Sequence, residues 1–67
     1  QRLSRNELRV YDALPLADTG GLEAAEIAAA CGFTIGLTVH LLMDLSGKGL
    51  VSRKGQLWER SDRETAS

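Results

Sequence analysis

The stretch of sequence that decides the fold is residues 24–46, AAEIAAACGFTIGLTVHLLMDLS. In its first part, four apolar residues recur at the spacing i, i+3, i+4, i+7, which predicts a helix with one apolar face. These residues are Ala24, Ile27, Ala28 and Cys31. Gly32 is the residue type that ends a helix in the left-handed conformation. The first part is therefore expected to be a helix from residue 23 or 24 to residue 31.

The second part predicts another helix after a short turn. Phe33 is expected to fold back onto the preceding helix as a hydrophobic contact. Thr34 is a suitable N-cap, so the next helix is expected to run from Ile35 to about Ser46. Its core stripe consists of Thr38, Leu41, Leu42 and Leu45. Two helices joined by a short turn that contains glycine are typical of a helix-turn-helix unit.

The sequence before this unit predicts a further helix that begins at Ser4. Ser4 and Glu7 have the spacing of a capping box, in which each side chain accepts a hydrogen bond from the other residue's backbone amide. Leu3 and Leu8 have the spacing of a hydrophobic staple, and Pro15 is expected to end the helix. The expected core stripe consists of Leu8, Tyr11, Ala13 and Leu14.

The sequence after the unit predicts a β-hairpin. Residues 50–53 (LVSR) and 56–60 (QLWER) are the two expected strands. Lys54 and Gly55 are the expected two-residue turn, because glycine tolerates a positive φ. A glycine-containing loop precedes the second helix, and Leu22 at its end is expected to make a short strand contact.

The order helix, helix, helix, hairpin predicts the fold class. The fold is expected to be mainly α with a small β-hairpin, namely a winged helix: a three-helix bundle with a helix-turn-helix, followed by a wing. Residues 1–60 are expected to form this one domain, and the polar residues 61–67 a disordered tail. Because the chain starts with Gln1 rather than Met, we expect it to be part of a longer protein.

Composition excludes several classes of protein. A chain of 67 residues has room for one domain with a small core. One Cys and one His supply neither an internal disulfide nor the four ligands of a structural zinc, so we expect no metal and no cofactor. The apolar runs are far shorter than the ~20 residues that cross a membrane, so no membrane partner is expected. A lone cysteine fits a reducing, cytoplasmic setting.

Catalysis is not expected either. Cys31 is the only thiol and lies on the apolar face of its helix, whereas a reactive thiolate needs an accessible, electropositive place. His40 is the only imidazole, and the sequence shows no obvious carboxylate that would orient it. The glycines form no phosphate-binding fingerprint. The sequence therefore predicts no enzyme and no catalytic residue.

Sequence-specific DNA binding is not favoured, and the net charge of −1 already argues against strong binding. In a helix-turn-helix, the outer face of the second helix enters the major groove, where Arg, Lys, Asn and Gln read base edges. The outward positions of this chain contain none of these residue types. They are Ile35 or Gly36, Leu37, Val39, His40, Met43 and Asp44. Alternatively, some of these apolar groups pack under the wing or the N-terminal segment.

Positive charge gathers in the wing instead. The candidate nucleic-acid contacts of the wing and of the helix before it are Lys48, Arg53, Lys54, Gln56, Arg60 and His40. A basic wing can hold a phosphate backbone without reading sequence, which predicts weak, sequence-independent DNA binding. The alternative is that these charges only keep an exposed hairpin soluble. Trp58 is either a base-stacking platform or, as is commoner for a lone Trp, a core anchor of the hairpin.

A surface for protein interaction is the third possibility. Leu37, Val39 and Met43 are expected to form an exposed apolar patch on the helix that starts at Ile35, and such patches usually mark a contact. Methionine suits an adaptable surface. The partner is left open between a second copy, another domain of the parent protein and a different protein.

Two sets of motifs resemble known families. Residues 25–28 (AEIA) with residues 31–34 (CGFT), and residues 42–51 (LMDLSGKGLV), resemble the helix-turn and the recognition helix of many bacterial winged-helix domains. Residues 8–15 (LRVYDALP) and the hairpin end at residues 57–60 (LWER) resemble the C-terminal domain of DNA-processing protein A, the DprA or Smf family.

This resemblance implies a function in natural transformation, where DprA proteins protect single-stranded DNA and load the RecA recombinase. In that family the main DNA site and the RecA contacts lie in a preceding Rossmann-like domain, whose residues cannot be matched to this sequence. The resemblance therefore implies an accessory domain. It would contact DNA weakly, or bind the Rossmann-like domain, RecA or a second copy. The alternative is the DNA-binding domain of a winged-helix transcriptional regulator.

Overall fold

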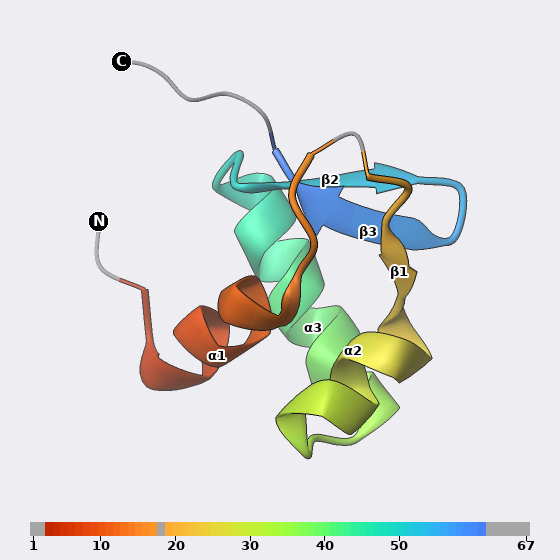
Figure 1. The fold of residues 1–67 in the computed structure, drawn as a ribbon. Coiled ribbons are helices and arrows are strands. Elements are labelled where there is room, and N and C mark those ends of the chain that lie inside the picture. Colours follow the sequence, from red (N-terminus) through yellow and green to blue (C-terminus); the bar gives the residue numbers. More distant parts are fainter. Residues whose placement is uncertain (1–2, 18, 62–67) are drawn as a thin grey trace.

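The computed structural model describes residues 3–17 and 19–61, which form three helices and a three-stranded antiparallel sheet (Figure 1). In chain order the elements are α1 (Arg5–Ala13), β1 (Leu22–Glu23), α2 (Ala24–Cys31), α3 (Ile35–Gly47), β2 (Val51–Lys54) and β3 (Leu57–Arg60). The predicted disordered tail lies outside the described residues, apart from Ser61.

The ends of the helices confirm the capping predictions. The Ser4 hydroxyl accepts from the Glu7 amide at 3.2 Å, and Glu7 Oε1 accepts from the Ser4 amide at 2.9 Å, which is a complete capping box. α2 ends at Gly32 in the left-handed conformation. Thr34 Oγ1 accepts from the Leu37 amide at 3.2 Å, so Thr34 is the N-cap of α3.

The predicted core stripe of α1 is wrong at Leu8, whose surface is 47 % exposed. The helix instead buries Glu7, Val10 and Leu14, which share one face at the spacing i, i+3, i+7. Because Glu7 is charged, the pattern of apolar residues in the sequence does not indicate this stripe. Leu3, the other residue of the expected staple, packs against the core.

The sheet has one strand more than the predicted hairpin. Its order is β1-β3-β2, and β1 pairs Leu22 with Trp58, which confirms the expected strand contact. The hairpin turn differs from the prediction by one residue: Lys54 pairs with Leu57, so the two turn residues are Gly55 and Gln56. Gly55 takes the positive φ of 65° that such a turn requires.

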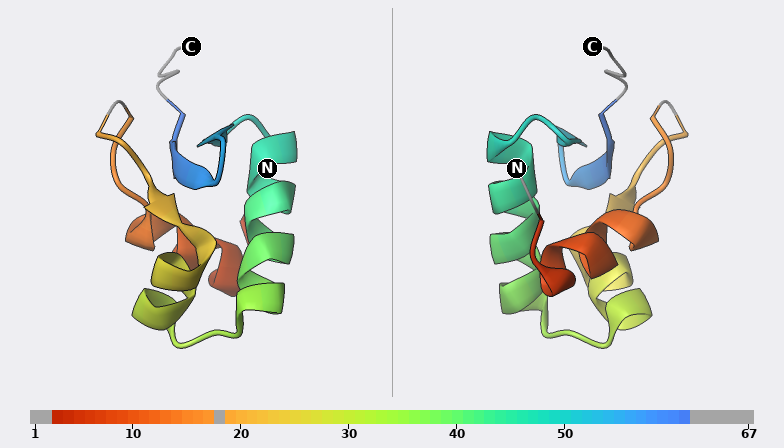
Figure 2. Two further views of the ribbon diagram at one scale, coloured as in Figure 1. Left: turned by 90° about the vertical axis from the view of Figure 1, so that its right-hand side faces the viewer. Right: turned by 90° about the vertical axis from the view of Figure 1, so that its left-hand side faces the viewer.

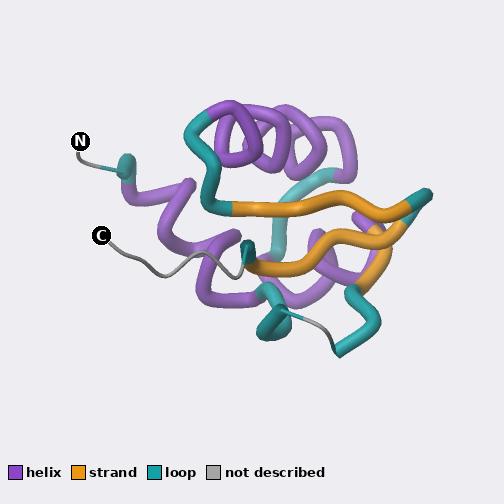
Figure 3. Tube along the Cα trace, turned by 90° about the horizontal axis from the view of Figure 1, so that it is seen from above, coloured by secondary structure: helices purple, strands orange, loops and turns teal. Residues whose placement is uncertain are grey.

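The core lies between the three helices and the inner face of the sheet. It consists of Val10, Leu14, Ile27, Cys31, Leu41, Leu42, Leu45, Val51 and Trp58. The predicted stripe of α3 is confirmed, including Thr38, whose hydroxyl donates to the Thr34 carbonyl at 2.9 Å. α3 stands along one side of the molecule, α1 and α2 lie on its inner side, and the hairpin runs beside it (Figures 2 and 3).

α2 and α3 meet at a bend of 106° across a short connection. No single helix in the described part of the chain is long and apolar enough to cross a membrane. These two pass that test only when they are taken together across the bend.

An ion pair between the exposed Lys48 and the buried Glu7 joins the end of α3 to the start of α1. Lys48 Nζ donates to both carboxylate oxygens of Glu7, at 3.0 and 3.1 Å. The backbone hydrogen bond from Ser4 and then the Lys48 ammonium hold the pKa of the Glu7 carboxyl below its usual value. These contacts explain how a charged residue is accommodated in the buried stripe of α1.

The Glu7 carboxylate makes stability depend on pH. Because its pKa is lower in the folded than in the unfolded chain, the ionised group stabilises the fold above the unfolded value of about 4.3. This stabilisation is lost as the pH falls through the lower folded value. We expect Glu7→Gln to lower the Tm at pH 7 and to flatten the fall of Tm between about pH 5 and pH 2, measured by circular dichroism.

Glu26 offers a matched control for this prediction, because its Oε1 caps the start of α2 by accepting from the Glu23 amide at 3.1 Å but lies at the surface. Glu26→Gln is expected to cost less and to keep the acid-dependent fall of Tm. Equal pH profiles for Glu7→Gln and the parent chain would contradict the assignment.

Gly21 packs directly against β3. A Cβ atom at this position would lie 2.9 Å from Leu57 Cβ and 3.0 Å from the Trp58 carbonyl oxygen, whereas a Cβ on Gly20 would meet nothing within 4 Å. Both glycines have positive φ, so alanine is strained at either position by about 1–3 kcal/mol. We expect Gly21→Ala to cost about 1–3 kcal/mol more than Gly20→Ala in urea unfolding, because of the clash. Equal losses would show that the chain at Gly21 does not approach β3 so closely.

Candidate interaction surface on α3 and the hairpin

α3 buries its inner stripe in the core, so the opposite face of this helix is turned to solvent. Two large apolar side chains are exposed there, Leu37 by 38 % and Met43 by 61 %. Ile35 is 54 % exposed in the first turn of α3, on nearly the same line of the helix as the buried Leu42. Figures 2 and 3 show no other described element outside α3 on this side. For these three residues the alternative of packing under the hairpin is therefore excluded, whereas Val39 is half-buried.

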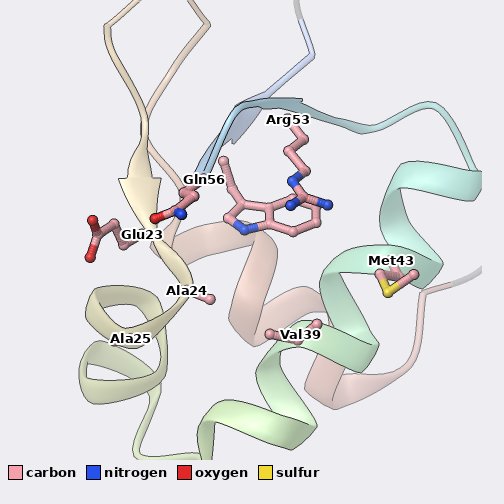
Figure 4. A pocket seen from close by; sticks show the side chains of 8 residues that line it. Glu23, Ala24, Ala25, Val39, Met43, Arg53 and Gln56 are labelled. Carbon is pink, nitrogen blue, oxygen red and sulfur yellow. The ribbon is translucent and has the colours of Figure 1, made fainter.

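An open groove of about 280 Å³ runs between α3, the start of α2 and the hairpin (Figure 4). It is lined by Glu23, Ala24, Ala25, Val39, Met43, Arg53, Gln56 and Trp58. Val39 and Met43 from α3 and Arg53 from the hairpin point toward the same space, whereas the Glu23 side chain points outward at the rim. The lining combines an apolar interior with one acidic and one basic group, which suits a small apolar side chain better than a phosphate.

The structure brings together only part of the predicted protein interface. Val39 and Met43 line the groove, but Leu37 does not. Successive residues of a helix are turned by about 100°, so Leu37 lies about 160° around α3 from Val39. The expected single patch is therefore two exposed areas on opposite flanks of the outer face.

Two of the predicted nucleic-acid contacts are engaged with α1. Lys48 forms the ion pair with Glu7 described above. Arg60 donates from Nε to the Tyr11 carbonyl at 3.3 Å and from Nη2 to the Asp12 carbonyl at 3.4 Å, and its guanidinium lies 4.8 Å from the Tyr11 ring centre. A cation at the last carbonyls of a helix is favourable, so Arg60 stabilises the C-terminus of α1.

Arg53 and Lys54 lie on the hairpin itself. The Arg53 guanidinium lies 5.3 Å from the Trp58 ring centre, and its Nε donates to the Gly55 carbonyl at 2.7 Å. Lys54 Nζ lies 3.4 Å from Oε2 of the buried Glu59. Of the six predicted nucleic-acid contacts, only Arg53 and Gln56 share the groove, and His40 lies on the outer face of α3 away from it.

Sequence reasoning missed Glu23, Ala24 and Ala25 as groove residues. They reach the groove because β1 pairs with β3, which places the first turn of α2 beside the hairpin. The only sequence signal was the expected strand contact of Leu22. That signal did not reveal which side chains β1 would bring there.

The chemistry-bearing residues are separate from one another. Burial raises the pKa of the Cys31 thiol, whose Sγ donates to the Arg9 carbonyl at 3.6 Å. Asp44 lies one turn from His40, and its Oδ2 is 3.8 Å from His40 Nε2, which is beyond hydrogen-bond distance. Within residues 3–17 and 19–61, no three His, Cys, Asp or Glu side chains gather in a possible metal site.

Comparisons of the chain with protein-family models, with curated proteins and with solved structures find no match. The function is therefore argued from the fold and the surface described above.

Trp58 reports on the groove because Arg53 lies over its ring and only 5 % of the residue is exposed. We expect Arg53→Ala to shift the Trp58 fluorescence to the red and to increase its quenching by acrylamide. The lost cation–π contact should cost about 0.5–1 kcal/mol of stability. The control is Gln56→Ala, which removes another groove side chain and should leave the emission unchanged. An unaltered spectrum in Arg53→Ala would mean that other groups shield the indole.

Proposed function

We propose that this chain is a winged-helix domain. Three features support the proposal. α2 and α3 meet at 106°, which falls within the 90–120° typical of a helix-turn-helix. A hairpin follows α3 directly, and β1, which lies between α1 and α2, joins it in one sheet. In this reading α3 is the recognition helix and the turn between β2 and β3 is the tip of the wing.

Its function is that of an accessory interaction module in a DNA-processing protein of the kind that DprA represents. The observation that carries this proposal is the outer face of α3. It exposes Leu37 and Met43, and no Arg, Lys, Asn or Gln lies on it between Ile35 and Gly47. Base edges are read by those four residue types, whereas exposed apolar side chains usually mark a protein contact.

DNA contact through the wing is weak in this proposal. Lys48 and Arg60 are engaged with α1, which leaves Arg53 and Lys54 as the cations of the wing proper. Glu23 at the rim of the groove and the buried Glu59 beside Lys54 add acidic charge to the same region. Two cations among carboxylates favour loose contact with a phosphate backbone without sequence readout.

The alternative is a transcriptional regulator that binds one operator sequence. We expect selection from a random duplex pool to enrich no sequence. Fluorescence anisotropy should give a Kd of about 10⁻⁴ M or weaker at physiological salt for duplex and single-stranded DNA alike. A duplex bound at least ~10³ times more tightly than random sequence would overturn the proposal and establish the regulator.

Matched variants test the role of the wing in the same assay. Arg53→Gln should weaken the residual binding and lower its salt slope by about one. Arg5→Gln removes an equal charge from the exposed start of α1, and should change neither. Equal effects of the two variants would show that binding depends on net charge alone rather than on the wing.

A further inference from the structure

The groove between α2, α3 and the hairpin contains hydrogen-bond donors that the fold itself does not use. We propose that this groove binds the C-terminal residue of a partner protein, which supplies a free carboxylate and a small apolar side chain on one carbon atom. This site rests on the proposed function, because it gives the interaction module a partner of defined chemistry.

The first unused donor is the indole N–H of Trp58. This residue lines the groove and is only 5 % exposed, and its Nε1 donates to no group within residues 3–17 and 19–61. Among the side chains of those ranges that are not exposed, Glu59 Oε1 alone lacks both a partner and contact with solvent. The Trp58 nitrogen therefore keeps contact with solvent. Because the indole of a buried Trp usually has a partner, this donor favours a ligand with an acceptor.

The terminal nitrogens of Arg53 are the second set of unused donors. Within the described part of the chain, only Nε of this guanidinium donates a hydrogen bond, to the Gly55 carbonyl at 2.7 Å. The group points toward the groove and lies 5.3 Å from the Trp58 ring centre (Figure 4). A planar guanidinium matches the two oxygens of a carboxylate. Charge and geometry therefore favour a carboxylate as the acceptor.

The rest of the wall favours a small apolar group beside that carboxylate. It consists mainly of Ala24 and Ala25 from α2 and Val39 and Met43 from α3. The groove measures about 280 Å³, which is below the range of about 300–1,000 Å³ for sites that bury a drug-sized ligand. In so small a space the apolar group and the carboxylate must be attached to nearly the same carbon atom. The last residue of a protein has this arrangement, whereas an Asp or Glu within a chain does not.

Glu23 determines which residue should precede the terminal one. Its side chain points outward at the rim of the groove, away from Arg53 (Figure 4). Its charge is therefore directed at the segment outside the groove rather than at the bound carboxylate. A cation just before the last residue is attracted to Glu23, and an anion there is repelled. The partner is thus expected to end in Lys or Arg followed by a small apolar residue.

The single tryptophan of the chain provides the readout, because its indole N–H gives one resonance in a proton–nitrogen correlation spectrum. The probe is the peptide N-acetyl-Gly-Lys-Val with a free carboxylate, and the control is the same peptide with a C-terminal amide. We expect the free acid to move the indole proton resonance downfield with a Kd of about 10⁻³ M, and the amide to bind about tenfold more weakly. An indole resonance that stays unmoved at about 10⁻² M free acid, or that both peptides move equally, overturns the proposal.

Free valine distinguishes a partner protein from a free amino acid as the occupant. Valine has the same side chain and carboxylate, but it lacks the cation that Glu23 is expected to attract. We expect it to bind more weakly than the peptide in the same titration. Valine that binds as tightly as the peptide overturns a protein C-terminus as the occupant.

Matched variants of α2 test the apolar wall. Ala25 and Ala29 are both exposed and lie one turn apart, but only Ala25 lines the groove. Ala25→Leu fills the groove and should abolish the indole shift, whereas Ala29→Leu should keep the Kd within about twofold of the parent value. Both changes suit a helix, so circular dichroism should show the same fold. Equal effects of the two variants on binding overturn the assignment of the groove.

A second pair of variants tests the carboxylate contact. Arg53→Gln should weaken binding of the free acid by about tenfold and leave binding of the amide unchanged. Arg5→Gln, which removes an equal charge from the exposed start of α1, should change neither. A loss in Arg53→Gln that is equal for the acid and the amide overturns the contact between this guanidinium and the carboxylate.

These outcomes are separate from the test of the proposed function. An unmoved indole resonance in a chain without sequence-selective DNA binding overturns this site and leaves an accessory module with a different binding surface. A chain that selects one duplex sequence overturns the proposed function, whatever the groove binds. Because Ala25→Leu changes no charge, its effect on the peptide is independent of DNA contact through the wing.

Discussion

The burial of the inner stripe of α3 is the constraint on which the rest of the structure depends. Leu42 and Leu45 are fully buried, and α1, α2 and β2 all pack against this helix. Their burial removes apolar surface from water, which is the main favourable term in a core this small. The same packing sets the rotation of α3 about its own axis. The outer face of α3 is therefore a consequence of the core.

The cations of the chain are used to hold the elements together. Lys48 joins α3 to α1 through Glu7, Arg60 joins β3 to the end of α1, and Arg53 covers Trp58. Lys48 pairs with a buried carboxylate, Arg60 donates to the carbonyl groups at a helix terminus, and Arg53 lies over an aromatic ring. A sequence count of positive charge in the wing therefore overestimates what remains to attract a phosphate backbone. This redistribution and the apolar outer face of α3 are the observations on which the proposed protein contact rests.

The elements could be predicted from the sequence because their signals are local. The capping box at Ser4, the N-cap at Thr34 and the glycine that ends α2 act within a few residues of themselves. The stripe of α1 could not be predicted in full because Glu7 is buried only by virtue of Lys48, which lies 41 residues later in the chain. The hairpin turn moved by one residue because pairing between strands, rather than the Lys-Gly dipeptide, sets its register.

The sequence by itself determined the three helices, the hairpin, the inner stripe of α3 and the absence of base-reading residues from its outer face. Periodicity and capping specify these features, and both are properties of short segments. Only the tertiary structure decided that Val39 and Met43 share a groove with the hairpin and the start of α2, while Leu37 lies on the other flank. It also decided that Lys48 and Arg60 contact α1, whereas Arg53 and Lys54 lie on the hairpin. These outcomes depend on how elements distant in sequence pack together, and no local pattern encodes that packing.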